Sequence, residues 1–331
     1  MRFLISRTDK IGDVVLTLPL AGWLKAKYPS CEVYFLGRTY TKSVIEASQH
    51  IDGFLNWDEL KKSKEALSTF KSFDFQTVFH VFPSQEIAFL CKKAGIPQRI
   101  GTSHRWYHWL TCTEKIDFSR KNSDLHEAQL NFRLLGLKGT TLPPLADLAG
   151  YYGMRKSPKI PPDFKKLLSV DKLNIILHPK SKGSAREWSL DNFKTLIELA
   201  DGRFQFFITG GPDEVEPLRE WAQGLKGVIF LAGSLSLEEF IPFLGACDGL
   251  IAASTGPLHL AASLGIHALG IFPPIKPMDP SRWAPIGKKA SYQVAAKSCS
   301  DCRRLASCAC MALVTPESVF ESLLAWRRNE I

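Results

Sequence analysis

The sequence has no run of about twenty apolar residues, the length that a helix needs to cross a bilayer. Its start carries charges at Arg2 and Asp9 and lacks the apolar core and small-residue cleavage site of a signal peptide. Blocks of consecutive lysine and arginine, which are typical of nucleic-acid binding, are also missing. These absences predict a cytoplasmic protein that neither spans a membrane nor binds nucleic acid.

Positive charge is nevertheless in excess. The 331 residues include 42 lysines and arginines against 33 aspartates and glutamates, a formal net charge of +9. Charge scattered in this way fits phosphorylated ligands, an anionic lipid surface, or simply a basic solvated surface. The length favours two domains, and 45% hydrophobic residues are ample for a packed core.

Cysteine is unevenly spread along the chain. Four of the eight cysteines are isolated and expected to be reduced, as is usual in the cytoplasm. The other four lie close together near the carboxyl end: Cys299, Cys302, Cys308 and Cys310. A zinc site is conceivable there, but the spacing matches no standard zinc ribbon. Reduced, packed thiols without a metal are the preferred interpretation.

Strand-like and helix-like segments alternate twice along the chain. The expected strands are 2–6, 32–36, 75–82, 99–101, 173–177, 204–209, 228–231, 250–253 and 268–272. The expected helices are 13–28, 84–94, 123–135, 190–200, 213–224, 237–246, 258–264 and 317–328. This alternation predicts an α/β fold with two parallel sheets facing a central cleft, in which ligands lie at the carboxyl ends of the strands.

The expected domains are 1–150 and 165–315, followed by a closing helix in 316–331 that could pack back on the first domain. The stretch 139–162 has no periodicity and is rich in proline and glycine, so it is expected to connect the two domains.

The first candidate loop, 6–14, lies between the first strand and the first helix. Gly12 would let the backbone approach a ligand closely. Asp13 lies near the helix start, where an aspartate caps well, and the same carboxylate beside a crevice could act as a general base. On this segment alone, capping is favoured over catalysis. The glycine pattern is not the G-x-G-x-x-G of dinucleotide-binding proteins.

Two further candidate loops follow strands of the second half. Segment 178–188 brings together Lys180, Ser181 and Arg186, which suit a diphosphate through charge-assisted hydrogen bonds. A solvated basic loop would have the same composition. Segment 209–214 ends in Glu214, which could accept hydrogen bonds from ribose hydroxyls or could simply place a negative charge at a helix start.

Segment 249–265 is the most informative part of the chain. A short apolar strand ends at Ser254 and Thr255, and Pro257 fits the first helical position. The two hydroxyls and the unpaired amides of Leu258 and His259 would bind an anion, phosphate above all. An ordinary capped helix is the alternative.

In order and spacing, these loops resemble the heptosyltransferases of glycosyltransferase family 9, which build the inner core of bacterial lipopolysaccharide. The resemblance runs from Arg2 to about Val319, and its most specific parts are 9–16, DKIGDVVL, and 254–262, STGPLHLAA. It implies a GT-B fold, with two Rossmann-like domains and the donor nucleotide in the C-terminal one. It also implies inverting transfer from ADP-L-glycero-D-manno-heptose, with no cofactor and no divalent metal.

The resemblance implies a role for each motif residue. Asp13 matches the family's proposed general base, Arg186 a basic position on the donor diphosphate, and Glu214 the acidic position near the ribose. The phosphate-side loop is matched by Thr255, Gly256 and His259. The chain departs from the pattern at Ser254, where many relatives carry aspartate, and at Arg186, where several have lysine.

The acceptor, a lipopolysaccharide core or another lipid-linked glycan, is expected on the N-terminal half, with the protein peripheral at the inner face of the inner membrane. Arg105, in the aromatic segment 104–109, could meet acidic sugar or phosphate groups. The neighbouring tryptophans could lie on sugar or lipid, or form a semi-buried loop. The rival functions are a nucleotide-sugar epimerase and a nucleotide-sugar-binding protein without catalysis.

Overall fold

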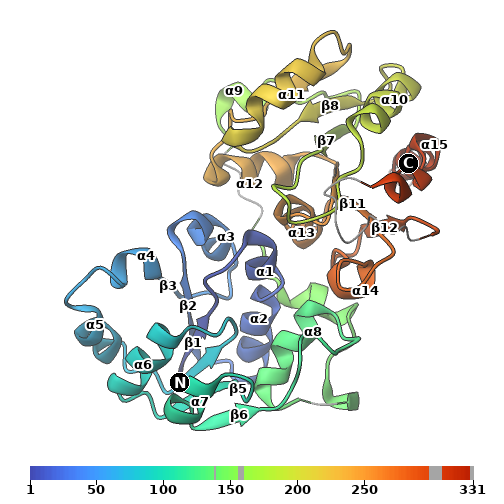
Figure 1. Ribbon diagram of the computed structural model, residues 1–331. Helices are drawn as coiled ribbons and strands as arrows, with labels where there is room; N and C mark the ends of the chain where they lie inside the picture. The colour runs from blue at the N-terminus through green and yellow to red at the C-terminus, as the bar shows by residue number, and fades with distance from the viewer. Residues whose placement is uncertain (138, 156–159, 298–307, 329–331) are drawn as a thin grey trace. The chain divides into compact units, whose positions relative to one another are not determined.

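The computed structural model describes residues 1–137, 139–155, 160–297 and 308–328. The chain divides into unit 1, Met1–Arg155, and unit 2, Lys156–Ile331. Figure 1 draws unit 1 from blue to green and unit 2 from light green to red. Each unit contains a parallel sheet covered by helices, so the α/β prediction is confirmed. In the described ranges, no helix combines the length and the apolar character that crossing a bilayer requires.

The sheet of unit 1 has six strands among the described residues, in the order β3-β2-β1-β4-β5-β6. They are β1 (Arg2–Ser6), β2 (Glu32–Gly37), β3 (Gly53–Asn56), β4 (Thr77–His80), β5 (Gln98–Thr102) and β6 (Glu114–Ile116). The helices are α1 (Ile11–Val15), α2 (Leu18–Lys27), α3 (Lys42–Glu46), α4 (Trp57–Leu60), α5 (Ala66–Ser72), α6 (Gln85–Lys93), α7 (Trp106–Thr111) and α8 (Glu127–Phe132). Strand order reverses between β1 and β4, and such a reversal is where open α/β sheets bind ligands.

The sheet of unit 2 is built in the same way, with the described strands in the order β12-β11-β10-β7-β8-β9. They are β7 (Asn174–His178), β8 (Gln205–Ile208), β9 (Val228–Phe230), β10 (Gly249–Ala253), β11 (His267–Phe272) and β12 (Ala290–Val294). The helices are α9 (Pro162–Lys165), α10 (Leu190–Ala200), α11 (Val215–Ala222), α12 (Leu237–Ala246), α13 (Gly256–Ser263), α14 (Pro280–Trp283) and α15 (Pro316–Arg328). Here the order reverses between β7 and β10.

The expected helix 13–28 is in fact two helices, α1 and α2, separated at Leu16 and Thr17. Pro19 explains the break, because a proline inside a continuous helix would lack the amide that bonds to the carbonyl four residues earlier. Pro19 instead lies in the first turn of α2, where this amide is not needed.

The expected connector is largely part of unit 1. Residues 147–151 form a 3₁₀ turn, and a Cβ atom on Gly22 of α2 would collide with the carbonyl oxygen of Tyr151. The buried Ser48 hydroxyl donates to the Tyr152 carbonyl at 2.7 Å. The prolines and glycines here belong to an irregular segment that packs tightly within unit 1. Composition alone does not distinguish such a segment from a linker.

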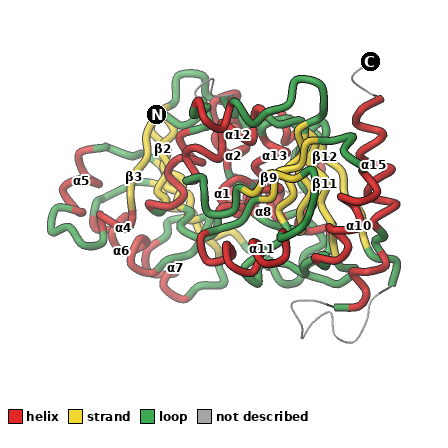
Figure 2. The backbone as a smooth tube through the Cα atoms, turned by 90° about the horizontal axis from the view of Figure 1, so that it is seen from above, coloured by secondary structure: helices red, strands yellow, loops and turns green. Residues whose placement is uncertain are grey.

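The closing helix, α15, packs on the core of unit 2. It lies along α10, as both views show (Figures 1 and 2). Trp326 of α15 stacks on His267 with ring centroids 4.7 Å apart and covers Gly249, where a Cβ atom would collide with the indole. The helix therefore completes the core of unit 2.

Candidate functional site

Asp13 lies in the first turn of α1, just after β1 and beside the reversal of strand order in unit 1. Its carboxylate does not cap the helix: Oδ1 forms an ion pair with Nη2 of Arg7. The capping interpretation is therefore wrong for this residue. The Asp13 side chain is 19% exposed, whereas that of Arg7 is 4% exposed. A buried cation thus holds a partly accessible carboxylate at the carboxyl end of β1.

Arg7 is held from several sides. It binds Asp9 in a bidentate manner, with Nε 2.8 Å from Oδ1 and Nη2 2.9 Å from Oδ2. Its Nη1 donates to Glu127 Oε1 at 3.2 Å and to Asn131 Oδ1 at 3.1 Å, both on α8. Burial raises the pKa of Asp9, and the nearby charge of Asp13 raises it further, while the Arg7 guanidinium acts in the opposite direction.

Arg120 connects this network to the loop after β4. Its Nη2 donates to Asn131 Oδ1 at 3.1 Å and to the carbonyl of Val81 at 3.2 Å, and its Nη1 pairs with Glu127. Asn131 in turn donates to the Leu16 carbonyl at 3.0 Å. The loops after β1 and β4 and the start of α8 are therefore cross-linked around the residue that carries the candidate base.

The other residues predicted for unit 1 are less closely grouped. Gly12 precedes Asp13 within α1. Arg105 is exposed and is the N-cap residue of α7, after β5, which β4 separates from β1. The structure thus places Gly12 beside Asp13, and Arg105 on a different strand connection of the same sheet.

In unit 2, the loop after β10 leads into α13, which begins at Gly256. The hydroxyl of Thr255 and the Nδ1 atom of His259 are buried without a hydrogen-bond partner among the residues that the structure describes. Burial lowers the pKa of His259 to about 4, so its imidazole is neutral near pH 7. These two groups mark the start of α13 as a place where an acceptor-rich ligand would find unused polar atoms.

One detail of the predicted anion site needs correction. The amide of His259 is 3.4 Å from the Thr255 carbonyl and so belongs to the helical ladder. Because α13 starts before Pro257, the amides without a partner inside the helix are those of Gly256 and Leu258. Ser254 and Thr255 directly precede the helix, with Ser254 half-buried.

The loop after β7 is ordered by Glu187, a residue that the sequence analysis did not select. Its Oε2 binds the ammonium of Lys180 at 3.0 Å, and its Oε1 accepts from the amide and the hydroxyl of Ser181 at 2.8 and 3.0 Å. The buried Ser181 hydroxyl is thus engaged in the loop itself. Glu187 holds Lys180 in place, and half-buried Arg186 lies next to it in the chain.

The loop after β8 is tied to the loop after β7. Lys182 Nζ lies 2.7 Å from Asp213 Oδ2, and a Cβ atom on Gly211 would lie only 2.9 Å from Lys182 Cε. Glu214 is buried, and its Oε2 accepts from the Gly211 amide at 2.7 Å. This bond supports the interpretation that Glu214 stabilises a helix start. It also occupies one of the two carboxylate oxygens that could accept hydrogen bonds from a ribose.

All three loops predicted to bind the donor follow adjacent strands of one sheet. β7 pairs with β10 on one side and with β8 on the other, and all are parallel. The predicted donor residues therefore gather at the carboxyl ends of the unit 2 strands, at the reversal of strand order. They are Lys180, Ser181, Arg186, Glu214, Ser254, Thr255, Gly256, Leu258 and His259.

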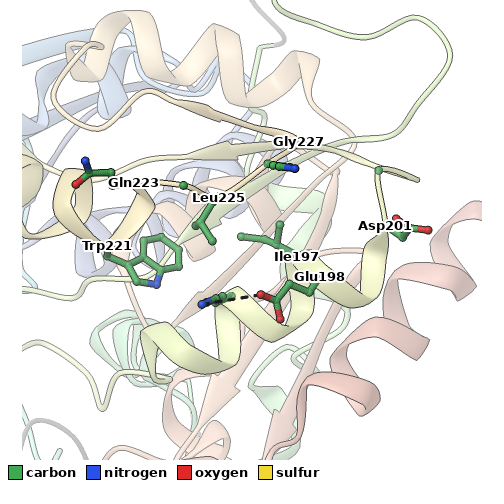
Figure 3. A pocket seen from close by; sticks show the side chains of 11 residues that line it. Ile197, Glu198, Asp201, Trp221, Gln223, Leu225 and Gly227 are labelled. Atoms are coloured by element: carbon green, nitrogen blue, oxygen red, sulfur yellow. Dashed lines mark ion pairs between the residues drawn. The ribbon is translucent and has the colours of Figure 1, made fainter.

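A cavity of about 650 Å³ lies elsewhere in unit 2 (Figure 3). It is lined by the last residues of α10, including Glu198, and by Trp221 and the turn that follows α11. Both β8 and β9 begin beside it, so it lies at the amino ends of these strands. The loops predicted to bind the donor lie at the carboxyl ends of the strands. The cavity is therefore not part of the candidate site.

The cysteine cluster is only partly described. Cys308 and Cys310 have sulfur atoms 2.9 Å apart, whereas Cys299 and Cys302 lie outside the described residues. Within the described part of the chain, no group of three or more histidine, cysteine and acidic side chains is arranged to hold a metal ion.

Buried histidines in both units predict acid sensitivity. Burial lowers the pKa of His80 to about 3 and those of His178 and His259 to about 4, from 6.5. Below pH 6.5 the unfolded chain therefore binds protons that the folded chain does not. Each such histidine should lower the free energy of unfolding by about 1.4 kcal/mol per pH unit down to its folded pKa. Above pH 6.5 such a histidine does not change the free energy of unfolding with pH.

Denaturant unfolding at about pH 8 and about pH 5 measures this loss in the free energy of unfolding. In unit 1, His80→Phe should make the loss between the two pH values smaller. His104→Gln is the control, because this side chain is 54% exposed. Equal stability at both pH values would refute the prediction.

Comparison with known proteins gives concordant matches. The family model described as glycosyltransferase family 9 (heptosyltransferase) matches residues 72–310. A Haemophilus influenzae protein provisionally named a glycosyltransferase is 28% identical over 298 residues, 86% of each chain. Lipopolysaccharide heptosyltransferase 3 of Escherichia coli is 22% identical over 280 residues, 79% of each chain.

Solved structures match over the whole chain. The E. coli ADP-heptose lipopolysaccharide heptosyltransferase II has a TM-score of 0.79 at 20% identity, covering 100% of this chain and 99% of that one. An E. coli heptosyltransferase solved with ADP has a TM-score of 0.68 at 17% identity, covering 98% of this chain and 100% of that one. These likenesses confirm the predicted GT-B-like fold.

Proposed function

The chain belongs to glycosyltransferase family 9, the heptosyltransferase family, and on that premise we propose that it transfers a heptose from ADP-L-glycero-D-manno-heptose to a lipopolysaccharide inner-core acceptor. The transfer inverts the anomeric centre, needs no divalent metal, and takes place at the cytoplasmic face of the inner membrane. Membership of a glycosyltransferase family argues against both rivals, an epimerase and a binding protein without catalysis.

The observation that carries the proposal is the pair of unused polar atoms at the start of α13. Thr255 Oγ1 and His259 Nδ1 are buried without a partner in the described chain, and the Gly256 and Leu258 amides add two donors. A helix N-terminus attracts negative charge. The donor's diphosphate supplies both the charge and the acceptors that this place lacks.

Cations of the neighbouring loop complete the donor site. Lys180 and Arg186 belong to the loop after β7, the strand next to β10. Glu187 restrains Lys180, so the ammonium is positioned before the donor arrives. As the bond from the anomeric carbon to the phosphate oxygen breaks, its electron pair stays on ADP. These cations and the α13 amides stabilise the growing charge, which is the work that a metal ion performs in other transferases.

Asp13 supplies the base. Its Oδ1 is bound by Arg7, so we assign Oδ2 to receive the proton of the acceptor hydroxyl. The acceptor oxygen forms its bond to the anomeric carbon on the side opposite the departing ADP, and the centre inverts. Gly12 leaves room for the acceptor beside this carboxylate, and Arg105 meets acidic groups of the acceptor.

Thr255→Val tests the donor site directly. The substitution keeps the shape of the side chain and removes the hydroxyl, so binding of ADP and ADP-heptose should weaken by about ten- to a hundredfold. Because this hydroxyl has no partner among the described residues, the ligand-free protein should not lose stability.

Titration calorimetry measures the affinity, and thermal unfolding measures the stability. Thr195→Val is the matched control, because its hydroxyl bonds to the Asp191 carbonyl within α10. If Thr255→Val binds ADP as tightly as the wild type does, the diphosphate does not lie at α13.

A further inference from the structure

Helix α7 presents an apolar face to solvent. Trp106, Trp109 and Leu110 are 64%, 63% and 56% exposed, and their spacing places them on one side of the helix. The opposite side, which includes the fully buried His108, packs into unit 1. A surface helix normally carries polar residues on its outer side, and a helix that is apolar all round is normally covered. The outer face of α7 therefore lacks the polar residues that solvent would favour.

This α7 face, defined as Trp106, Trp109 and Leu110, is held rigidly. The indole nitrogen of Trp109 donates to the Ser103 carbonyl at 2.9 Å. Lys92 of α6 donates to the Leu110 carbonyl at 2.7 Å, which fixes the end of the helix against its neighbour. The bulky side chains are thus presented by an ordered element, so a partner would gain apolar contact without first ordering the helix.

Cations surround the α7 face. Lys115 Nζ lies 5.3 Å from the centre of the Trp109 ring. Arg105 is the N-cap residue of the helix, and Lys92 contacts its last turn. The acidic residues of the neighbouring strand β6 and the loop after it are Glu114 and Asp117, and Asp117 lies 3.1 Å from the exposed His104 ring. Tryptophan, leucine and a basic rim form the combination that binds the interfacial layer of an anionic bilayer.

We propose that the α7 face docks on an anionic lipid surface, with the two indoles and Leu110 in the interfacial layer and the basic rim on lipid phosphates. The proposal rests on the proposed function in one respect, since a lipid-linked acceptor brings the enzyme to a bilayer. A protein partner fits less well, because the exposed apolar side chains lie on a helix of only six residues.

Co-sedimentation of the full chain with vesicles tests the proposal. One vesicle contains phosphatidylglycerol and phosphatidylethanolamine, and the other contains phosphatidylcholine alone. Wild-type protein should bind the anionic vesicle, and binding should weaken as salt is added. The triple variant W106S/W109S/L110S should bind it at least about tenfold more weakly, because each buried apolar side chain contributes to partitioning.

The matched control is Y292S/V294S, which removes two exposed apolar side chains, 50% and 41% exposed, from β12 of unit 2. It should bind like the wild type, and circular dichroism confirms that all variants are folded. The additional single variant Leu110→Ser keeps both indoles in place and should show an intermediate loss.

Three results would overturn the proposal: equal binding to both vesicles, no binding of the wild type, or unchanged binding of the triple variant. Light scattering without vesicles shows whether the α7 face instead joins two copies of the chain, in which case the wild type is a dimer and the triple variant a monomer. Asp13→Asn should bind vesicles like the wild type. Loss of transfer and loss of docking can therefore be told apart.

Discussion

Asp13→Asn should lower kcat of heptose transfer by about 10²–10⁴-fold, the usual contribution of a general base. Asparagine keeps the size of the side chain and can still accept a hydrogen bond from Arg7 through its amide oxygen. It cannot take a proton from the acceptor hydroxyl. Because the residues proposed to bind the donor lie in unit 2, calorimetric affinity for ADP should remain at the wild-type value.

Asp58→Asn is the control for this loss. Asp58 is also an aspartate of unit 1 paired with an arginine, with Oδ1 3.1 Å from Arg38 Nη2, but it lies in α4, away from the reversal of strand order. Its replacement should leave transfer unchanged. Asp13→Asn activity within a few-fold of the wild type would show that another group accepts the proton.

Arg7→Met should have the second-largest effect, a loss of about 3–5 kcal/mol in the free energy of unfolding of unit 1. The guanidinium is buried and contacts Asp9, Asp13 and Glu127. Its removal leaves these carboxylates facing one another in a poorly hydrated place, where Arg120 still pairs with Glu127. Arg7→Lys should recover only part of the lost free energy of unfolding. The ammonium restores the positive charge, but it cannot reach all of these partners at once.

Denaturant unfolding, followed by a probe in each unit, measures this change, since a two-unit chain need not unfold in one step. Arg2→Met is the control: its partner Glu32 is 44% exposed, and its removal should leave the midpoint close to that of the wild type. Transfer by Arg7→Met, measured at a temperature where it is folded, should also fall, because Asp13 loses the contact that orients it. An unchanged midpoint would mean that the network is not a source of stability.

The alternation of strands and helices was predictable because each buried strand is a continuous apolar run and each covering helix has its own period. Three of the four edge strands among the described residues were not. β3, β6 and β12 lie at the sheet edges, where a few half-buried residues suffice and the sequence shows no apolar run, whereas the fourth edge strand, β9, was expected at 228–231. Packing of 147–155 against α2 depends on Gly22, whose partner lies far along the chain.

The candidate site was predictable as loops, and much less so as contacts. A strand end followed by a helix start shows where ligands gather, which is why Asp13 and Thr255 stand out in the sequence. Arg7 follows β1 directly and could have been noticed on the same ground. Its partners Glu127 and Asn131 lie 120 and 124 residues away. No local pattern links a buried arginine to such distant groups.

The same limit applies to finer geometry. The role of Glu187 depends on the bend of its loop, and the free amides of α13 depend on the residue at which the helix begins. A shift of two residues moved one of the two expected donors from His259 to Gly256.

In the proposed reaction, one chain binds ADP-heptose at α13 and deprotonates the acceptor with Asp13. This reaction is tested most directly by incubating the protein with ADP-heptose and a heptose-deficient lipopolysaccharide core, then following the acceptor by mass spectrometry and the release of ADP. We expect the acceptor to gain one heptose for each ADP released, with no free heptose. Release of free heptose without any gain in acceptor mass, or no turnover of ADP-heptose at all, would contradict the proposal.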